Sequence, residues 1–238
     1  MAKGTRLSGA TLLITGGGSG LGRRMALGAA RRGSRVVIWD VDAKAGAAVR
    51  DEIRAAGGSA EARAVDVTDR EAVAAAAAAA GPVDVLVNNA GVVSGQPLLD
   101  ATDEAIERTM NVNVMALYWV TRAFLAGMAS RRHGTVVTVA SAAGLVGVAR
   151  QTDYSASKFA AFGFNESLRA EVRAARLGVN TLVVCPYYID TGMFDGVQTR
   201  WPMLLPILQE EDVATKVLDA IEAGRRKLVL PPLVNLLP

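Results

Sequence analysis

The chain has 238 residues, of which 51% are hydrophobic and 21% are charged, and its formal net charge is +3. This length and composition suit one globular domain and exclude a disordered chain. Arginine greatly outnumbers lysine, but the arginines are spread along the chain. This spread indicates solvated helix faces and argues against nucleic acid as a partner. Cys185 is the single cysteine, so no intramolecular disulfide is expected, and a reducing, cytoplasmic location is predicted.

Neither end of the chain predicts a membrane span. The first ten residues lack the apolar core of a signal peptide, and no stretch reaches about 18 continuous apolar residues. The C-terminal segment 228–238 is apolar and follows a basic cluster, in "RRKLVLPPLVNLLP". Two interpretations stay open for this tail: a last strand with a subunit contact, or a peripheral contact with lipid.

Seven short apolar runs alternate with segments of helical length. Runs without polar alternation are typical of parallel strands covered on both faces, and strand–helix repetition favours a doubly wound sheet. We therefore expect a single α/β domain over 1–238, a Rossmann-type parallel seven-stranded sheet with helices on both faces. Its cofactor half should cover about 8–140, and its catalytic and substrate-loop half about 141–230. The predicted strands are 10–15, 35–39, 60–65, 83–88, 134–140, 179–185 and 227–230.

A cluster of glycines follows the first predicted strand and opens a helix. Glycines permit a tight turn and close backbone approach, and a helix N-terminus offers unpaired N–H groups to a diphosphate. A purely structural turn would also use glycine, but the strand before, the helix after and an acid about 20 residues on favour a bound dinucleotide. The predicted phosphate-binding residues are Gly16, Ser19, Gly20, Leu21 and Gly22.

That acid is Asp40, at the end of the second predicted strand. A carboxylate there accepts hydrogen bonds from the ribose hydroxyls of NAD and repels the 2′-phosphate of NADP. NADP-binding proteins usually carry a basic residue nearby, whereas this chain has Ser19 in the glycine turn and Val41 after the acid. The sequence therefore predicts NAD as the cofactor, with NADP disfavoured.

The spacing T-G-x-x-x-G-x-G, which begins at Thr15, resembles the fingerprint of the short-chain dehydrogenase/reductase family. The resemblance runs from about residue 8 to about residue 230. It implies that Asp66 and Val67 contact the adenine, and that "NNAG" lines the cofactor through Asn88, Ala90 and Gly91.

The segment "YSASK" places Tyr154 and Lys158 four residues apart, on one face of a helix. A phenol, with a pKa near 10, is a poor base at neutral pH, and a nearby ammonium would lower that pKa. A Tyr/Lys pair at this spacing is common in amphipathic helices. Ser141, thirteen residues before Tyr154, and Asn113 extend the family pattern, with Asn111 as the neighbouring alternative to Asn113.

The resemblance implies a role for each of these four residues. Tyr154 would remove the hydroxyl proton, while Lys158 would hold the nicotinamide ribose and lower the tyrosine pKa. Ser141 would bind the substrate oxygen, and Asn113 would support a proton relay to solvent. No metal is expected, since the cofactor carries the chemistry and the only histidine, His133, lies in a predicted surface turn.

The stretch "CPYYIDTGMF" after the sixth strand predicts the substrate end of the site. Pro186, Ile189 and Thr191 match family positions near the nicotinamide. Tyr187 replaces a glycine usual in the family, which adds a large amphipathic ring to the pocket wall. Either tyrosine could instead belong to the core, and Tyr188 is the better candidate for that position.

Three segments, "CPYYIDTGMF", "NVNVMALYWVTRAF" and "WPMLLPILQEEDVATKVLDAI", look most like retinol and hydroxysteroid dehydrogenases, a branch that works at membranes or lipid droplets. This likeness implies a bulky lipophilic alcohol, bound by Ser141, Tyr154, Tyr187, Met193 and Phe194. An apolar lid is expected at Trp201, Met203, Leu204 and Leu205. These side chains could instead pack only against the protein or a neighbouring subunit.

The sequence thus predicts an NAD-dependent oxidoreductase that interconverts a steroid-, retinoid- or long-chain-like alcohol and its carbonyl. A reductase of small carbonyls, such as diketones or 3-oxoacyl thioesters, is the enzymatic alternative. A non-catalytic NAD-binding sensor or scaffold is the alternative of another class. The family resemblance also implies a homodimer or homotetramer.

Overall fold

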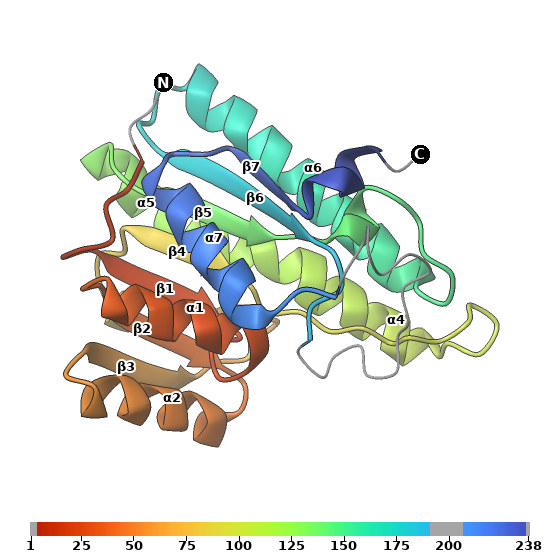
Figure 1. Ribbon diagram of the computed structural model, residues 1–238, viewed down its shortest axis with the longest axis horizontal. Helices are drawn as coiled ribbons and strands as arrows, with labels where there is room; N and C mark the ends of the chain where they lie inside the picture. The colour runs from red at the N-terminus through yellow and green to blue at the C-terminus, as the bar shows by residue number, and fades with distance from the viewer. Residues whose placement is uncertain (1–3, 191–206, 237–238) are drawn as a thin grey trace.

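The computed structural model describes residues 4–190 and 207–236 (Figure 1). Within them, strands and helices alternate along the chain. The strands are β1 (Thr11–Thr15), β2 (Arg35–Asp40), β3 (Ser59–Ala64), β4 (Val85–Asn88), β5 (Thr135–Val139), β6 (Asn180–Pro186) and β7 (Lys227–Leu230). The α-helices are α1 (Gly20–Arg31), α2 (Ala43–Ala55), α3 (Arg70–Ala80), α4 (Asp103–Met110), α5 (Ala116–Arg131), α6 (Thr152–Ala174) and α7 (Glu210–Glu222). Short helical turns occupy η1 (Asn111–Met115), η2 (Ala142–Gly144) and η3 (Pro232–Leu236).

The strands form one parallel sheet in the order β3-β2-β1-β4-β5-β6-β7. The chain winds outward from β1 to β3, returns to β4 beside β1, and then winds to the other edge. This reversal between β1 and β4 opens a crevice at the carboxyl ends of the strands, where ligands bind in sheets of this kind. The predicted single-domain, doubly wound seven-stranded fold is therefore confirmed.

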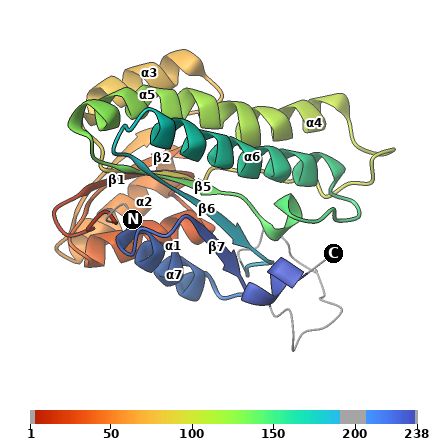
Figure 2. The same ribbon diagram turned by 90° about the horizontal axis from the view of Figure 1, so that it is seen from above.

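Helices cover both faces of the sheet. Figure 2 shows α1, α2 and α7 on one face and α3 to α6 on the other. Each layer packs on the sheet through its own apolar cluster. Residues of β2 from Val36 to Trp39 are fully buried, and the Trp39 ring lies 5.6 Å from that of Phe124 on α5. Burial on both faces explains why the strands read as continuous apolar runs.

One stretch meets the length and composition of a membrane span. The helical stretch Asp103–Arg131 has a mean hydropathy of 1.3 over its most apolar window, 44% of which is buried. A count of continuous apolar residues misses it because polar residues interrupt it. In the fold, Val120, Phe124 and Met128 of this stretch are buried against the sheet. Length and composition alone are weak grounds for a span here.

At the C-terminal end, β7 pairs in parallel with β6. The last-strand interpretation of the tail is thus correct as far as Leu230. Beyond it, Val234 is buried and Leu233 is 37% exposed. Whether Leu233 contacts a second subunit or lipid stays a prediction.

Candidate active site

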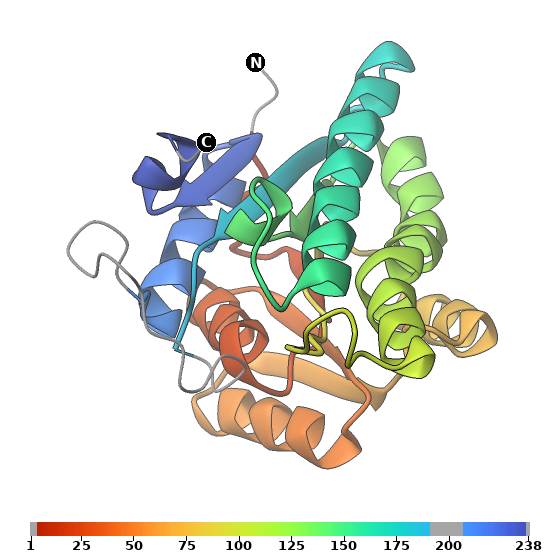
Figure 3. The ribbon, with the colours of Figure 1, turned by 90° about the vertical axis from the view of Figure 1, so that its right-hand side faces the viewer.

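A cavity of about 670 Å³ lies at the carboxyl edge of the sheet, the edge that faces the viewer in Figure 3. Its walls come from the segments after β1, β2, β3, β4, β5 and β6, together with α4 and the start of α6. Residues far apart in the sequence therefore meet in one place. Most of the predicted site residues are among them: Gly16, Ser19, Gly20, Leu21, Gly22, Asp40, Asp66, Val67, Ala90, Gly91, Ser141, Tyr154, Lys158, Pro186, Tyr187 and Ile189.

The glycine turn needs its glycines for two different reasons. Gly16 and Gly20 have φ values of 63° and 50°, in the left-handed region that favours glycine. Gly22 instead permits close packing, because a Cβ there would lie 2.0 Å from the carbonyl oxygen of Gly16. These glycines thus let the chain pass from the end of β1 directly to the start of α1.

The first turn of α1 fits a phosphate group. Its N-cap residue, Ser19, makes no side-chain capping hydrogen bond, and the turn contains no acidic residue. The next three residues, Gly20, Leu21 and Gly22, line the cavity. Backbone N–H groups at a helix start without a side-chain cap form an anion site, and the helix dipole adds to the attraction. The residues present therefore fit the diphosphate of a dinucleotide.

Thr15 and Asn89 join the glycine turn to the segment after β4. The Thr15 hydroxyl accepts hydrogen bonds from the N–H groups of Asn89 and Ala90, at 3.0 and 3.1 Å. The Asn89 side-chain amide donates to the carbonyl oxygens of Thr15 and Gly16, both at 3.0 Å. Two walls of the cavity are thereby fixed to each other.

Of the two adjacent asparagines, Asn89 lines the cavity and Asn88 does not. Asn88 is buried beneath it and donates to the Thr121 hydroxyl at 3.0 Å. The expectation that Asn88 contacts the cofactor therefore does not match its position. Successive side chains at a strand end point to opposite sides, and the sequence does not show which of two identical residues faces the cavity.

Asp40 lies at the cavity with its carboxylate held by the backbone. One oxygen accepts from the N–H of Gly18 at 2.8 Å, and the other from the N–H of Asp42 at 3.0 Å. Val41, 74% exposed, lines the cavity beside it. Asp66 and Val67 lie on the wall formed after β3, joined by Val65 and Thr68, which the sequence interpretation missed.

Ser141, Tyr154 and Lys158 meet on the cavity wall as predicted. The Lys158 ammonium lies 5.5 Å from the centre of the Tyr154 ring and donates to the carbonyl oxygen of Val139 at 3.0 Å. The Ser141 hydroxyl accepts from the N–H of Ala143 at 3.1 Å, and its hydrogen bond with Tyr154 lowers the tyrosine pKa. The serine hydroxyl is thus oriented by the backbone N–H two residues further along the chain.

Burial dominates the titration of this pair. It raises the pKa of Tyr154 to about 12, against the opposing hydrogen bond with Ser141. It lowers the pKa of Lys158 to about 8. Loss of water around the phenol therefore outweighs the hydrogen bond from Ser141 in these surroundings. The role of Lys158 in lowering the tyrosine pKa stays a prediction.

Asn113 lies behind the cavity wall, in the π-helical turn η1. Its side chain accepts from the N–H of Val92 at 2.8 Å and donates to the carbonyl oxygen of Val92 and to the hydroxyl of Ser157, both at 2.9 Å. Ser157 donates in turn to the carbonyl oxygen of Tyr154. Asn111 lines the cavity instead. π-helical turns often mark functional sites.

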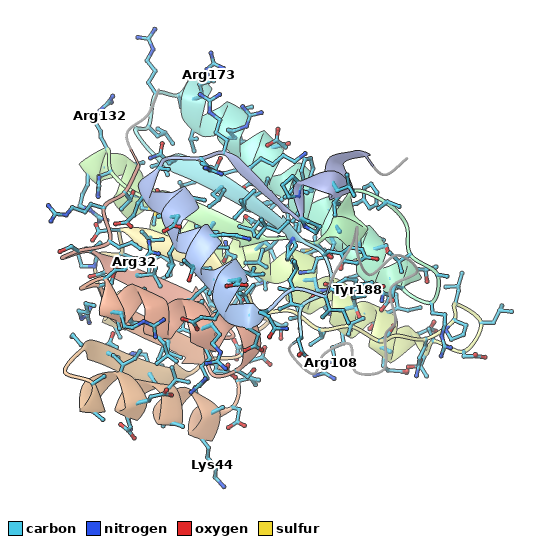
Figure 4. All side chains as sticks on the ribbon, in the orientation of Figure 1. Arg32, Lys44, Arg108, Arg132, Arg173 and Tyr188 are labelled. Carbon is cyan, nitrogen blue, oxygen red and sulfur yellow. The ribbon has the colours of Figure 1, made fainter. Side chains whose placement is uncertain are left out.

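The two tyrosines after β6 both face the site. Their rings lie 4.8 Å apart at 73°. Both line a smaller cavity of about 40 Å³ that also touches Ser141 and Tyr154. Tyr188, the better sequence candidate for a core position, instead lines this cavity and is a candidate substrate contact. Figure 4 places it at the same end of the molecule as Arg108. The other residues around this cavity are Ala142, Ala143, Val146, Val148 and Gln151.

Several predictions concern residues outside the described part of the chain. These are Thr191, Met193, Phe194, Trp201, Met203, Leu204 and Leu205. In the opposite direction, α4 adds Glu104, Glu107 and Arg108 to the cavity wall, which no motif indicated. Polar residues on one helix face are typical of solvent exposure, so the sequence carries no signal for them.

Comparison with known proteins places this arrangement in a family. A family model described as short chain dehydrogenase matches residues 10–200. Epidermal retinol dehydrogenase 2 of Mus musculus is 43% identical over 231 residues, which cover 94% of this chain and 75% of that protein. Retinol dehydrogenase 10-B of Danio rerio is 40% identical over 252 residues, with coverage of 94% and 75%.

Solved structures agree with these matches. A short-chain dehydrogenase/reductase of Burkholderia phymatum in complex with NAD superposes with a TM-score of 0.89, at 30% identity, over 98% of this chain and 92% of that one. A metagenomic short-chain oxidoreductase in complex with NADP gives a TM-score of 0.80 at 31% identity, over 94% and 97% of the two chains. The chain therefore belongs to the short-chain dehydrogenase/reductase family, in its retinol dehydrogenase-like branch, and is an oxidoreductase that acts on CH–OH groups with a nicotinamide cofactor.

Proposed function

We propose that this protein is an NAD-dependent dehydrogenase of a bulky, lipophilic secondary or allylic alcohol, and that it catalyses the reverse reduction under suitable conditions. The observation that carries this is that Ser141 and Tyr154 lie between two cavities, a large one that reaches Asp40 and a small one walled by Tyr187 and Tyr188. The first is large enough for a dinucleotide, and the second, which has room for only a few atoms, gives the reacting end of an alcohol an aromatic wall. Relatives named retinol dehydrogenases support the same substrate class.

Each chemical role that the family pattern implies falls to a residue on this wall or directly behind it. Ser141 and Tyr154 hold the alcohol oxygen, and Tyr154 removes its proton as the carbonyl forms. Lys158, held by the carbonyl of Val139, provides a hydrogen-bond donor for a ribose hydroxyl. Asn113 binds the backbone of Val92 and, through Ser157, the backbone of Tyr154. These hydrogen bonds hold the two parts of the cavity wall in a fixed position relative to each other. A bound nicotinamide supplies the acceptor for the hydride that leaves the carbinol carbon.

The preference for NAD over NADP rests on Asp40. Its carboxylate is already fixed by two backbone N–H groups at the cavity wall, and uncharged Val41 follows it. A 2′-phosphate would meet this negative charge, whereas two ribose hydroxyls would donate to it. We expect kcat/KM at least tenfold higher with NAD than with NADP. Replacement of Asp40 by serine should reduce that ratio, and an unchanged ratio would remove Asp40 as its cause.

A substrate screen tests the proposed activity. All-trans retinol, hydroxysteroids, long-chain secondary alcohols and acetoin would be offered with each cofactor, and 3-oxoacyl thioesters would be offered for reduction. We expect the highest kcat/KM with a lipophilic alcohol, and loss of turnover but not of NADH binding in Tyr154→Phe. A preference for acetoin or a thioester would support the small-carbonyl alternative. Binding of NADH without turnover of any substrate would support the sensor alternative.

We also infer a homodimer or homotetramer in the cytoplasm. Tyr118 on α5 and Phe159 on α6 are 43% and 47% exposed, and Met115 in η1 is 37% exposed, which suits burial between copies of the chain. Sedimentation at micromolar concentration tests the assembly, and a monomer there would overturn it. Cell fractionation tests the location, and recovery with membranes would favour a peripheral lipid contact through the C-terminal tail.

A further inference from the structure

Asp153 is a buried carboxylate that directly precedes Tyr154 in the first turn of α6. It is 7% exposed, and none of the ion pairs among the described residues includes it. Its two oxygens accept hydrogen bonds from the hydroxyls of Ser94, at 2.9 Å, and Thr109, at 2.8 Å. A buried carboxylate is costly unless it is well bonded, so its place beside the predicted general base calls for a reason.

The two hydroxyls come from two separate walls of the large cavity. Ser94 lies in the segment after β4, two residues beyond Val92, which lines the cavity. Thr109 lies on α4, next to Arg108, which also lines it. Asn113 already binds both backbone polar groups of Val92. The segment after β4 is therefore fixed at two points, and Asp153 is the second.

We propose that Asp153 is a positioning residue for the reaction, because it fixes the segment after β4 and helix α4 against the helix that carries Tyr154 and Lys158. This rests on the proposed function, since an alcohol held at Tyr154 lies beside these walls. A displacement of about 1 Å between a base and its substrate can lower a rate roughly a hundredfold. The carboxylate acts through the walls and does not touch the reacting atoms.

The number of hydrogens in this cluster predicts which substitution should preserve it. The Thr109 hydroxyl lies 2.8 Å from Asp153 and 2.9 Å from the carbonyl oxygen of Ala105, and it has one hydrogen for these two acceptors. An asparagine at position 153 would donate to Thr109, which would then donate to Ala105. Its amide oxygen would still accept from Ser94. Asparagine should therefore replace aspartate in this role, whereas alanine should not.

The kinetic experiment compares D153A, D153N, S94A and the double variant S94A/D153A with wild type, at a temperature where circular dichroism shows all of them folded. For the best alcohol of the screen, D153A should lower kcat/KM about 10- to 100-fold, chiefly through kcat, because the base and the substrate are no longer aligned. D153N should remain within about threefold of wild type. The double variant should be no worse than D153A, because Ser94 and Asp153 act as one unit. Asp103→Ala, which removes an exposed carboxylate of α4, is the matched control and should change kcat/KM less than twofold.

Amide hydrogen exchange of residues 91–110 provides a readout that needs no substrate. D153A should exchange faster there than wild type, and D153N should not. If wild type oxidises no alcohol, the proposed function fails while this measurement still tests the positioning role. Wild-type kinetics or wild-type exchange in D153A would overturn the proposal. D153N as impaired as D153A would also overturn it, because the charge and not the bonded geometry would then be what matters.

Discussion

Replacement of Lys158 by methionine should stabilise the protein while it abolishes turnover. Lys158 is 5% exposed, and burial lowers its pKa from about 10.5 to about 8. At about 1.4 kcal/mol for each pKa unit, the buried ammonium costs roughly 3 kcal/mol at pH 7. Methionine has a similar length and no charge, and it forfeits the hydrogen bond to Val139, worth about 1 kcal/mol. The net gain of about 2 kcal/mol corresponds to a Tm about 4–8 °C higher.

The pH dependence of this gain tests its cause. Because the folded-state pKa of Lys158 is lowered, its favourable contribution is present above pH 10.5 and is lost as pH falls through about 8. The advantage of Lys158→Met should therefore shrink by about 2 kcal/mol between pH 7 and pH 9.5. Thermal and urea unfolding without cofactor measure it, with exposed Lys216→Met as the control. A variant no more stable than wild type at pH 7, or a gain independent of pH, would refute the reasoning.

Three further outcomes are expected. Gly22→Ala should destabilise the fold by at least about 2 kcal/mol and weaken NADH binding, because its Cβ would lie 2.0 Å from the Gly16 carbonyl oxygen. As the control, Gly163→Ala places its Cβ in open space on α6 and should raise the Tm slightly. Thr15→Val should cost about 2–3 kcal/mol in urea unfolding, because two N–H groups lose their acceptor. Since burial raises the pKa of Tyr154 to about 12, kcat/KM for alcohol oxidation should rise by up to tenfold per pH unit from pH 6 to 8, and a flat profile would count against Tyr154 as the base.

The sequence predicted the sheet well because its inner strands are buried on both faces, whereas edge strand β3 is partly exposed. Apolar runs in such strands, bounded by glycine or a polar residue, mark their own ends, and the observed strands begin and end within two residues of the predicted ones. The site motifs could be recognised equally well from the sequence, because the glycine spacing and the interval between Tyr154 and Lys158 depend only on local geometry. Asn88 and Tyr188 were different: their roles depend on which way a side chain leaves the end of a strand, and neighbouring residues of the same type give no indication.

The role of Asp153 and the raised pKa of Tyr154 could not be predicted from the sequence, for a related reason. Both depend on how completely other segments cover the start of α6, which no spacing along that helix records. In the structure, three ionisable side chains of this one helix are at least nine-tenths buried, namely Asp153, Tyr154 and Lys158. Burial is costly for the Asp153 carboxylate and the Lys158 ammonium, so the start of α6 is a place where local stability is given up for a fixed arrangement of reactive groups. Stabilising substitutions of Tyr154 or Lys158 should therefore reduce activity, whereas those on the exposed part of α6, such as Gly163→Ala, should leave it unchanged. That contrast is a direct way to separate residues that serve the reaction from residues that serve the fold.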